Sequence, residues 1–254
     1  MNFEVTGSGE AAIVLSAGLG GAAAFWAPQR ATLEKHFRVV AFDQRGTGRN
    51  AGPLPDGYTI GHMADDVLEV MGQAGIARAH FLGHALGGLV GLELARRHSE
   101  RLSRMVLVNA WAKADRHSER CFDIRIGILH AQGPDAYVAA QPLFLHTAPY
   151  MSQNFERISA EVAHGVAHFQ GEENLLKRIG ALRAFDARAD LAEIMVPTLV
   201  AASRDDLLVP WTASQALAEG LPVSELWITP EGGHAFSVEQ PEPFNRAMLD
   251  FLLA

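Results

Sequence analysis

The sequence predicts an α/β fold with a mostly parallel, doubly wound sheet and an inserted helical cap. Short, nearly continuous apolar segments alternate with amphipathic segments over most of the chain. This alternation stops between residues 111 and 190, where only helical fragments are expected. At 254 residues, 48% of them hydrophobic, the chain can bury one large core. We therefore expect residues 1–110 and 191–254 to form the core and residues 111–190 to form the cap.

Six apolar segments have the character of strands that are buried on both faces. Such strands are typical of a parallel sheet that helices cover on both sides. The segments are AAIVLSAG (11–18), FRVVAFD (37–43), AHFLGH (79–84), RMVLVNA (104–110), TLVAAS (198–203) and ELWIT (225–229). Their alternation with helices favours a doubly wound sheet, in which ligands bind at the carboxyl ends of the strands.

The helices between these strands are predicted from apolar residues three or four positions apart. Residues 59–75 carry this spacing at Ile60, Met63, Val67, Val70 and Met71, with Gly72 or Gly75 as the stop signal. Residues 87–100 and 243–254 show similar spacing. Residues 111–190 are too many for an ordinary connection, which is why we expect a cap there.

Composition narrows the class of function. The net charge of -8 argues against nucleic acid or an anionic membrane surface as the partner. The single cysteine, Cys121, excludes an intramolecular disulfide and the usual cysteine-rich zinc sites. The chain shows no secretory signal and no apolar run of the length of a membrane span. We expect a cytoplasmic protein that acts on a small molecule without a metal or other cofactor, and we leave a homodimer open.

The segment LGHALGG, residues 82–88, has the spacing of the strand–turn–helix on which many hydrolases carry a nucleophilic serine. Gly83 and Gly87 flank the central position, where strand and helix approach closely. The central residue is Ala85, which has no hydroxyl group. Taken alone, the segment is more typical of a tight turn without any catalytic role.

A glycine-rich segment, LSAGLGG (15–21), follows an early strand. In hydrolases with this turn, a backbone N–H from such a loop and the N–H after the nucleophile form the oxyanion hole. The candidates here are the amides of Leu19 and Leu86. A phosphate site is the alternative, but the later glycine of a dinucleotide motif and the lysine of a P-loop are absent.

Two further segments that follow strands carry a candidate acid and a candidate histidine. SRDDLLVP (203–210) offers Asp206, with Asp205 as the alternative, and TPEGGHAF (229–236) offers His234. Alone, such an aspartate is more often a helix cap, and a lone histidine is more often structural. The chain order of turn, acid and histidine is the order of an α/β-hydrolase triad.

Together with FDQRGTGRN (42–50), these segments resemble the α/β-hydrolase superfamily over nearly the whole chain. A narrower resemblance, to the small α/β-hydrolase of bacterial pyrimidine utilisation, rests on GLGGAAAFWAPQ, GHALGGLVGLELA, NAW, RCF, QPLFL, AHFQGEENLL, DDLLVP and GGHAF. That family is described as an aminoacrylate or a carbamate hydrolase. It carries G-H-A-L-G at the turn, which implies that Ala85 is native and not an engineered replacement of serine.

The resemblance implies hydrolysis of a small, labile pyrimidine-degradation intermediate, either carbamate or 3-aminoacrylate, with release of ammonia. No acyl-enzyme can form at Ala85, so we expect His234, oriented by Asp206, to activate a water molecule, while the Leu19 and Leu86 amides stabilise negative charge. A substrate carboxylate would need a local cation. The substrate-binding candidates are Arg45, Arg116, Arg120, Arg125 and Trp111, although exposed arginines and a core tryptophan are the simpler interpretation.

Other functions stay open at this point. A non-catalytic protein that binds a small ligand is one alternative, although packing alone does not require an Asp206–His234 pair. A serine esterase or amidase inactivated by a serine-to-alanine change at Ala85 is another, and a cofactor-free oxygenase or lyase is a third. His164 and His168 have a spacing that metals can use, but no nearby carboxylate completes a zinc motif, so a structural role is favoured.

Overall fold

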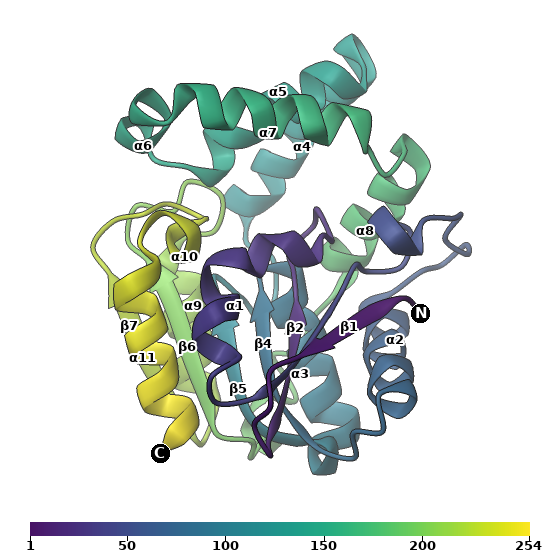
Figure 1. Ribbon diagram of the computed structural model, residues 1–254. Coiled ribbons are helices and arrows are strands. Elements are labelled where there is room, and N and C mark those ends of the chain that lie inside the picture. The colour runs from purple at the N-terminus through teal and green to yellow at the C-terminus, as the bar shows by residue number, and fades with distance from the viewer.

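The computed structural model describes residues 1–254 and confirms the α/β architecture (Figure 1). Seven strands form one sheet in the order β1-β3-β2-β4-β5-β6-β7. Their bounds are β1 Phe3–Thr6, β2 Ala12–Ser16, β3 Arg38–Phe42, β4 Ala79–His84, β5 Leu102–Val108, β6 Thr198–Ser203 and β7 Ser224–Thr229. All neighbours pair in parallel except β1, which pairs antiparallel with β3.

The six predicted strands are present, and β1 is one further strand that the apolar pattern does not predict. It is a four-residue edge strand, FEVT, with no fully buried residue. An edge strand with polar and apolar residues in alternation lacks the continuous apolar run by which the other strands were identified.

Helices cover both faces of the sheet. One face carries α1 (Ala27–Leu33), α10 (Phe236–Glu239) and α11 (Pro241–Leu253), and the other carries α2 (Ile60–Gln73), α3 (Leu86–His98) and α9 (Trp211–Gly220). In β2, Ile13 and Leu15 join the core cluster under α1 and α11, whereas Ala12 and Val14 join the larger cluster on the other face. This two-sided burial explains why the strand sequences are apolar at every position.

The predicted pattern of α2 is confirmed in detail. All five apolar residues on which the helix was predicted are buried. The Thr59 hydroxyl accepts a hydrogen bond from the backbone N–H of His62 at the start of the helix. The helix ends just before Gly75, whose φ of 67° lies in the left-handed region that favours glycine.

Between β5 and β6 the chain forms helices and no strand. The helices are α4 (Arg116–Gln132), α5 (Pro134–Leu145), α6 (Ala148–Gln153), α7 (Phe155–Ala167) and α8 (Glu172–Ala184). We call residues 111–190 the cap segment. In Figure 1 its helices α4–α7 lie above the carboxyl ends of the strands, with α8 descending at one side. An isolated bridge between Lys113 and Asp186 joins its two ends.

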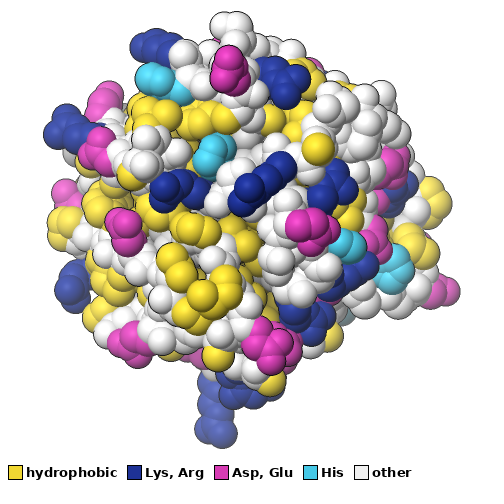
Figure 2. Space-filling model, turned by 90° about the horizontal axis from the view of Figure 1, so that it is seen from below, with side chains coloured by type: hydrophobic (Ala, Val, Ile, Leu, Met, Phe, Trp, Pro, Cys, Tyr) yellow, Lys and Arg dark blue, Asp and Glu magenta, His cyan; other side chains and the backbone are white.

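The face of the molecule opposite the cap segment carries a mixed surface. Figure 2 shows acidic, basic and apolar side chains interspersed over this face, without a large area of one charge. None of the helices combines the length and the apolar character needed to cross a membrane.

Candidate active site

Ala85 forms the turn between β4 and α3. Its φ of 47° and ψ of -112° are strained for a residue with a Cβ atom, and only Asn109 shares a positive φ among the other non-glycine residues. A Cβ at Gly83 would lie 2.4 Å from the Gly87 carbonyl oxygen, and a Cβ at Gly87 would lie 2.3 Å from the Ser16 carbonyl oxygen. The turn therefore has the close strand–helix approach of a nucleophile elbow, with a methyl group where the nucleophile would be.

The predicted oxyanion-hole donors are the backbone amides of Leu19 and Leu86. Leu86 is the first residue of α3, so its N–H has no acceptor within the helix. Neither the Leu86 N–H nor the Leu19 N–H donates a hydrogen bond within the chain. Ser16 pairs with Gly83 across adjacent parallel strands, which brings the loops after β2 and β4 to the same edge of the sheet.

His234 and Asp206 meet at this edge, although they lie in loops after different strands. The distance from His234 Nδ1 to Asp206 Oδ2 is 2.7 Å, and the residues are only 2% and 9% exposed. A carboxylate only accepts, so Nδ1 carries the proton and Nε2 is the nitrogen that can take one. Asp206 Oδ1 accepts from the Leu208 and Val209 N–H groups at 2.7 and 2.9 Å, which fixes the carboxylate.

Asp205, the alternative acid, does not contact His234. Its carboxylate accepts from the Ser203 hydroxyl at 2.6 Å and from the Gly233 and Gly232 N–H groups at 2.9 and 3.3 Å. Asp205 thus joins the loops after β6 and β7, whereas Asp206 is the aspartate that the structure brings to the histidine.

His84 and Asn109 were not assigned a role from the sequence, yet both hold His234. The His234 carbonyl accepts from His84 Nε2 at 2.9 Å and from Asn109 Nδ2 at 2.7 Å. The His84 ring stacks on Phe25 and meets the His234 ring edge-on, with centroids 4.5 and 4.6 Å apart. Burial, together with the neighbouring His234, lowers the pKa of His84 well below its ordinary value, so the ring is neutral. An asparagine after a strand tolerates the left-handed backbone seen here, which is a weak signal on its own.

Arg178 is a second contact that the sequence did not reveal. Its guanidinium is completely buried and donates to the Leu19 carbonyl at 3.2 Å, to the Gly18 carbonyl at 3.5 Å and to the Gln44 side chain. Burial lowers its pKa to about 10, so it stays protonated at neutral pH. The Gly18 carbonyl belongs to the same peptide group as the Leu19 N–H, so Arg178 of α8 helps to orient that amide.

The other end of the cap segment contacts the histidine loop. The Ala235 N–H donates to the Leu145 carbonyl at 2.8 Å, directly beside His234. Thr147 donates to the Glu239 carboxylate from its backbone N–H at 2.9 Å and from its hydroxyl at 2.8 Å. The cap segment is therefore hydrogen-bonded both to the loop that contains Leu19 and to the loop that contains His234.

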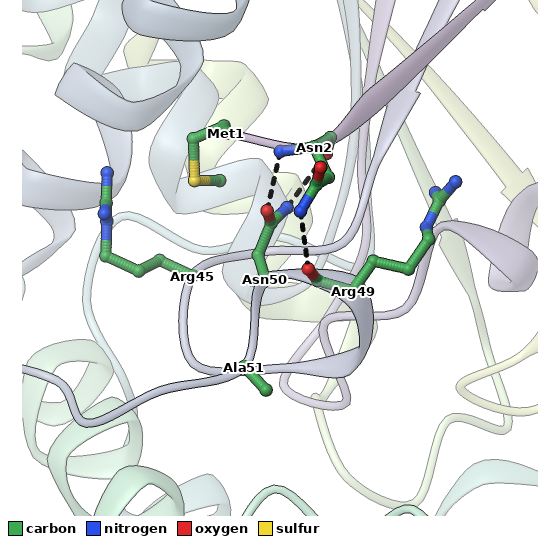
Figure 3. Close-up of a pocket in the computed structure, with 6 residues that line it drawn as sticks. All are labelled: Met1, Asn2, Arg45, Arg49, Asn50 and Ala51. Atoms are coloured by element: carbon green, nitrogen blue, oxygen red, sulfur yellow. Dashed lines mark hydrogen bonds between the residues drawn. The ribbon is translucent and has the colours of Figure 1, made fainter.

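No hydrogen bond or ion pair joins three of the predicted cations to the His234–Asp206 pair. Arg45 pairs with Asp66 at 2.5 Å and with Glu69 at 2.9 Å, beside a surface pocket of about 350 Å³ next to the N-terminus (Figure 3). Arg116 and Arg120 are exposed and form no ion pair.

The remaining candidates lie inside the molecule or on the cap surface. Arg125 is 4% exposed and has no carboxylate partner. Trp111 is 2% exposed and packs in the larger core cluster, with its indole nitrogen unpaired. His164 and His168 are exposed and stack on each other with centroids 4.1 Å apart, and no group of metal-ligating side chains exists in the chain.

Comparison with known proteins places this geometry in context. Residues 11–140 match a sequence family described as the alpha/beta hydrolase fold. Proteins from Agrobacterium fabrum and Variovorax paradoxus, both named "Putative carbamate hydrolase RutD", are 54% and 53% identical; they match 100% and 99% of this chain over 98% and 96% of their own lengths. The solved enol-lactonase from Burkholderia xenovorans LB400 is 32% identical with a TM-score of 0.90, covering 100% of this chain and 96% of its own.

Proposed function

Because the chain belongs to the α/β-hydrolase family, we propose that it is a hydrolase of a small, labile intermediate of pyrimidine degradation, either carbamate or 3-aminoacrylate, and that it releases ammonia. The names of its relatives support C–N bond hydrolysis of a carbamate. The observation that carries the proposal is the 2.7 Å contact between His234 and Asp206 beside an elbow that has no nucleophile. This arrangement supports a reaction with water in place of a serine.

In the proposed reaction, His234 Nε2 takes a proton from water while the water oxygen bonds to the carbon that carries nitrogen. Asp206 stabilises the imidazolium that forms, and the imidazolium then returns the proton to the leaving nitrogen. Carbamate and water give bicarbonate and ammonia, whereas 3-aminoacrylate, through its imine tautomer, gives a three-carbon aldehyde acid and ammonia. The Leu19 and Leu86 amides stabilise the oxyanion that forms from a carbamate, or the oxygen that water adds to the imine carbon.

The lability of these substrates makes an elbow with Ala85 sufficient. Loss of the serine from a triad costs on the order of 10⁶ in kcat, whereas an oxyanion hole and binding retain about 10³–10⁴ over water. A general base contributes about 10²–10⁴-fold. Such accelerations are useful for compounds that already decompose in water, and they are too small for an ordinary amide.

A direct test compares His234→Ala with His164→Ala, a matched control on the exposed face of the cap segment. The substrate is freshly generated carbamate or 3-aminoacrylate, and the assay follows ammonia and the carbon product after subtraction of the uncatalysed rate. We expect His234→Ala to lose the catalysed rate and His164→Ala to keep it. Full activity in His234→Ala would contradict the proposal, and the carbon product distinguishes carbamate from 3-aminoacrylate.

Binding without turnover is the second candidate function, and the absence of a hydroxyl at Ala85 is the observation that favours it. Tight binding of a small carboxylate, together with an ammonia rate equal to the uncatalysed one, would support it. The buried His234–Asp206 pair favours catalysis instead, because such a pair adds nothing to packing that two apolar residues would not.

A further inference from the structure

Arg125 is a buried cation in the cap segment that has no anionic partner. Its side chain lies on α4 and is 4% exposed. The acidic residues of the same helix, Glu119 and Asp123, pair with Arg183 of α8 and not with Arg125. A charge that leaves water without a counter-ion is unfavourable, so a buried guanidinium in this state needs a reason beyond packing.

The neighbours of Arg125 hold its guanidinium but leave part of it unused. The Nη2 nitrogen donates to the Tyr137 hydroxyl at 3.1 Å and to the Gln141 side chain, whereas Nε and Nη1 make no hydrogen bond. The rings of Phe122, Tyr137 and Phe144 lie 5.3, 5.6 and 5.6 Å from its Cζ atom. Burial raises the pKa of the Tyr137 hydroxyl, so this phenol is neutral and supplies no negative charge. The Arg125 guanidinium is therefore held in place by its neighbours, while its Nε and Nη1 hydrogens remain available to a ligand.

Contacts of its neighbours place Arg125 over the His234–Asp206 side of the candidate site. Cys121 lies one helical turn before Arg125, and its Sγ atom is 3.7 Å from the carbonyl oxygen of Leu207, the residue after Asp206. Phe144, which faces the guanidinium, precedes Leu145, and the Leu145 carbonyl accepts from the residue after His234.

A third connection leads to the oxyanion loop. Tyr137, the hydrogen-bond partner of Arg125, packs against Phe169 with ring centroids 6.1 Å apart. Gln170, the next residue, donates to the Leu19 carbonyl at 3.4 Å. The three connections reach three different parts of the candidate site, and from them we infer that Arg125 faces the site from the cap segment. Figure 1 shows α4, the helix that carries Arg125, above the carboxyl ends of the strands.

We propose that Arg125 binds the carboxylate of the substrate, and that the substrate is a small carboxylate whose reacting carbon is separate from its carboxyl carbon. This inference rests on the proposed function for the reaction at His234. The ligand would supply the missing counter-ion through charge-assisted hydrogen bonds in a site from which water is largely excluded.

This position of the carboxylate distinguishes the two candidate substrates. In 3-aminoacrylate, the carbon that loses nitrogen is separated from the carboxyl carbon by a further carbon, so Arg125 can hold one end while His234 directs water to the other. In carbamate, a single carbon carries both the nitrogen and the negative oxygens. The proposed separation of the carboxylate from the reacting carbon is thus present in the three-carbon substrate and absent from carbamate.

The test measures binding, so that it does not depend on turnover. The variants are Arg125→Met and the matched control Arg183→Met, since Arg183 also faces the Phe122 ring, at 5.8 Å, but is paired with carboxylates. The probes are propanoate and propanamide, which have the same shape and differ in charge. Affinities come from nuclear magnetic resonance titration. We expect wild type and Arg183→Met to prefer propanoate by at least about tenfold and Arg125→Met to show no preference.

Thermal unfolding without ligand separates this role from a structural one. If Arg125 serves to bind the ligand, Arg125→Met should unfold at the same temperature as wild type or at a higher one, because the substitution removes an unpaired buried charge. If Arg125 serves only to stabilise the fold, the unfolding temperature of Arg125→Met should decrease clearly, and that result would overturn the proposal. If Arg125→Met does not fold, Arg125→Gln replaces it, and failure of both to fold overturns the proposal as well.

The role of Arg125 and the proposed function give different results when either is wrong. A propanoate preference that persists in Arg125→Met, or that is absent from wild type, overturns the role of Arg125 whatever the turnover. A propanoate preference that depends on Arg125, in a protein that releases no ammonia above the uncatalysed rate, contradicts the proposed function and leaves the carboxylate site in place.

Discussion

Replacing Asp206 by asparagine tests the protonation of His234 with little change in shape. Asp206 Oδ1 accepts from the N–H groups of Leu208 and Val209 at 2.7 and 2.9 Å, so an amide oxygen is expected at the same place. The amide nitrogen then faces His234 Nδ1, which is 2.7 Å from Oδ2 in the wild type. A donor at that position favours the tautomer with the proton on Nε2, and His234 can no longer act as the base.

The expected loss follows from this change of tautomer. The whole contribution of the general base, about 10²–10⁴-fold, should disappear from ammonia release. The free energy of unfolding should fall by about 1.5–3 kcal/mol, because one charge-assisted hydrogen bond is weakened, so the variant stays folded. Rates are measured with the uncatalysed reaction subtracted, and unfolding is measured with urea.

Asp205→Asn is the control for this prediction. Asp205 accepts from the Ser203 hydroxyl and from two backbone N–H groups, but it does not touch His234. We expect its variant to lose some stability and to keep the tautomer and most of the rate. Equal losses in the two variants, or a wild-type rate in Asp206→Asn, would refute the reasoning.

Three further predictions concern the turn and the sheet. Ala85→Ser should raise hydrolysis of p-nitrophenyl acetate by at least about 10²-fold, and no gain would contradict the assignment of position 85 as the nucleophile position. Gly87→Ala places a Cβ 2.3 Å from a backbone oxygen of β2 and should lower the free energy of unfolding by about 1–3 kcal/mol. Gly72→Ala is the control, because a Cβ at this position of α2 meets open space and should leave that free energy unchanged. Urea unfolding of the two variants measures the difference. Burial, with a smaller effect of nearby arginines, lowers the pKa of His80 from 6.5 to about 4. Only the unfolded chain takes up this proton in that range, so stability should fall as pH drops from 6.5 to 4, and His80→Asn should reduce that slope in urea unfolding at several pH values.

Much of the fold could be predicted because strands buried on both faces have continuous apolar sequences. The edge strand β1 lacks that feature and was missed. The proximity of Asp206 and His234 could be anticipated from chain order and from the rule that parallel strands end at one edge of the sheet. The hydrogen bonds from His84 and Asn109 to the His234 carbonyl could not, since they join side chains and backbone more than 100 positions apart.

The buried arginines were the hardest feature to assign from the sequence. Arginine is usually exposed, so the simpler interpretation placed the cap arginines in solvent. That interpretation holds for Arg116 and Arg120, but Arg125 is buried, and so is Arg178, which lies in no recognised motif. Nothing in the local sequence distinguishes them, because their burial depends on which helix faces the core after the cap segment has folded.

The hydrogen bonds from two parts of the cap segment to the loops of the candidate site have a consequence for protein engineering. Arg178 holds the carbonyls of the loop that contains Leu19, and Leu145 accepts from the residue after His234. A cap transplanted from another hydrolase would bring new substrate contacts, but it would also remove supports of both loops. A chimera must therefore carry the matching residues of each loop along with the grafted helices, and recombination at the cap boundaries alone should give folded proteins with impaired chemistry.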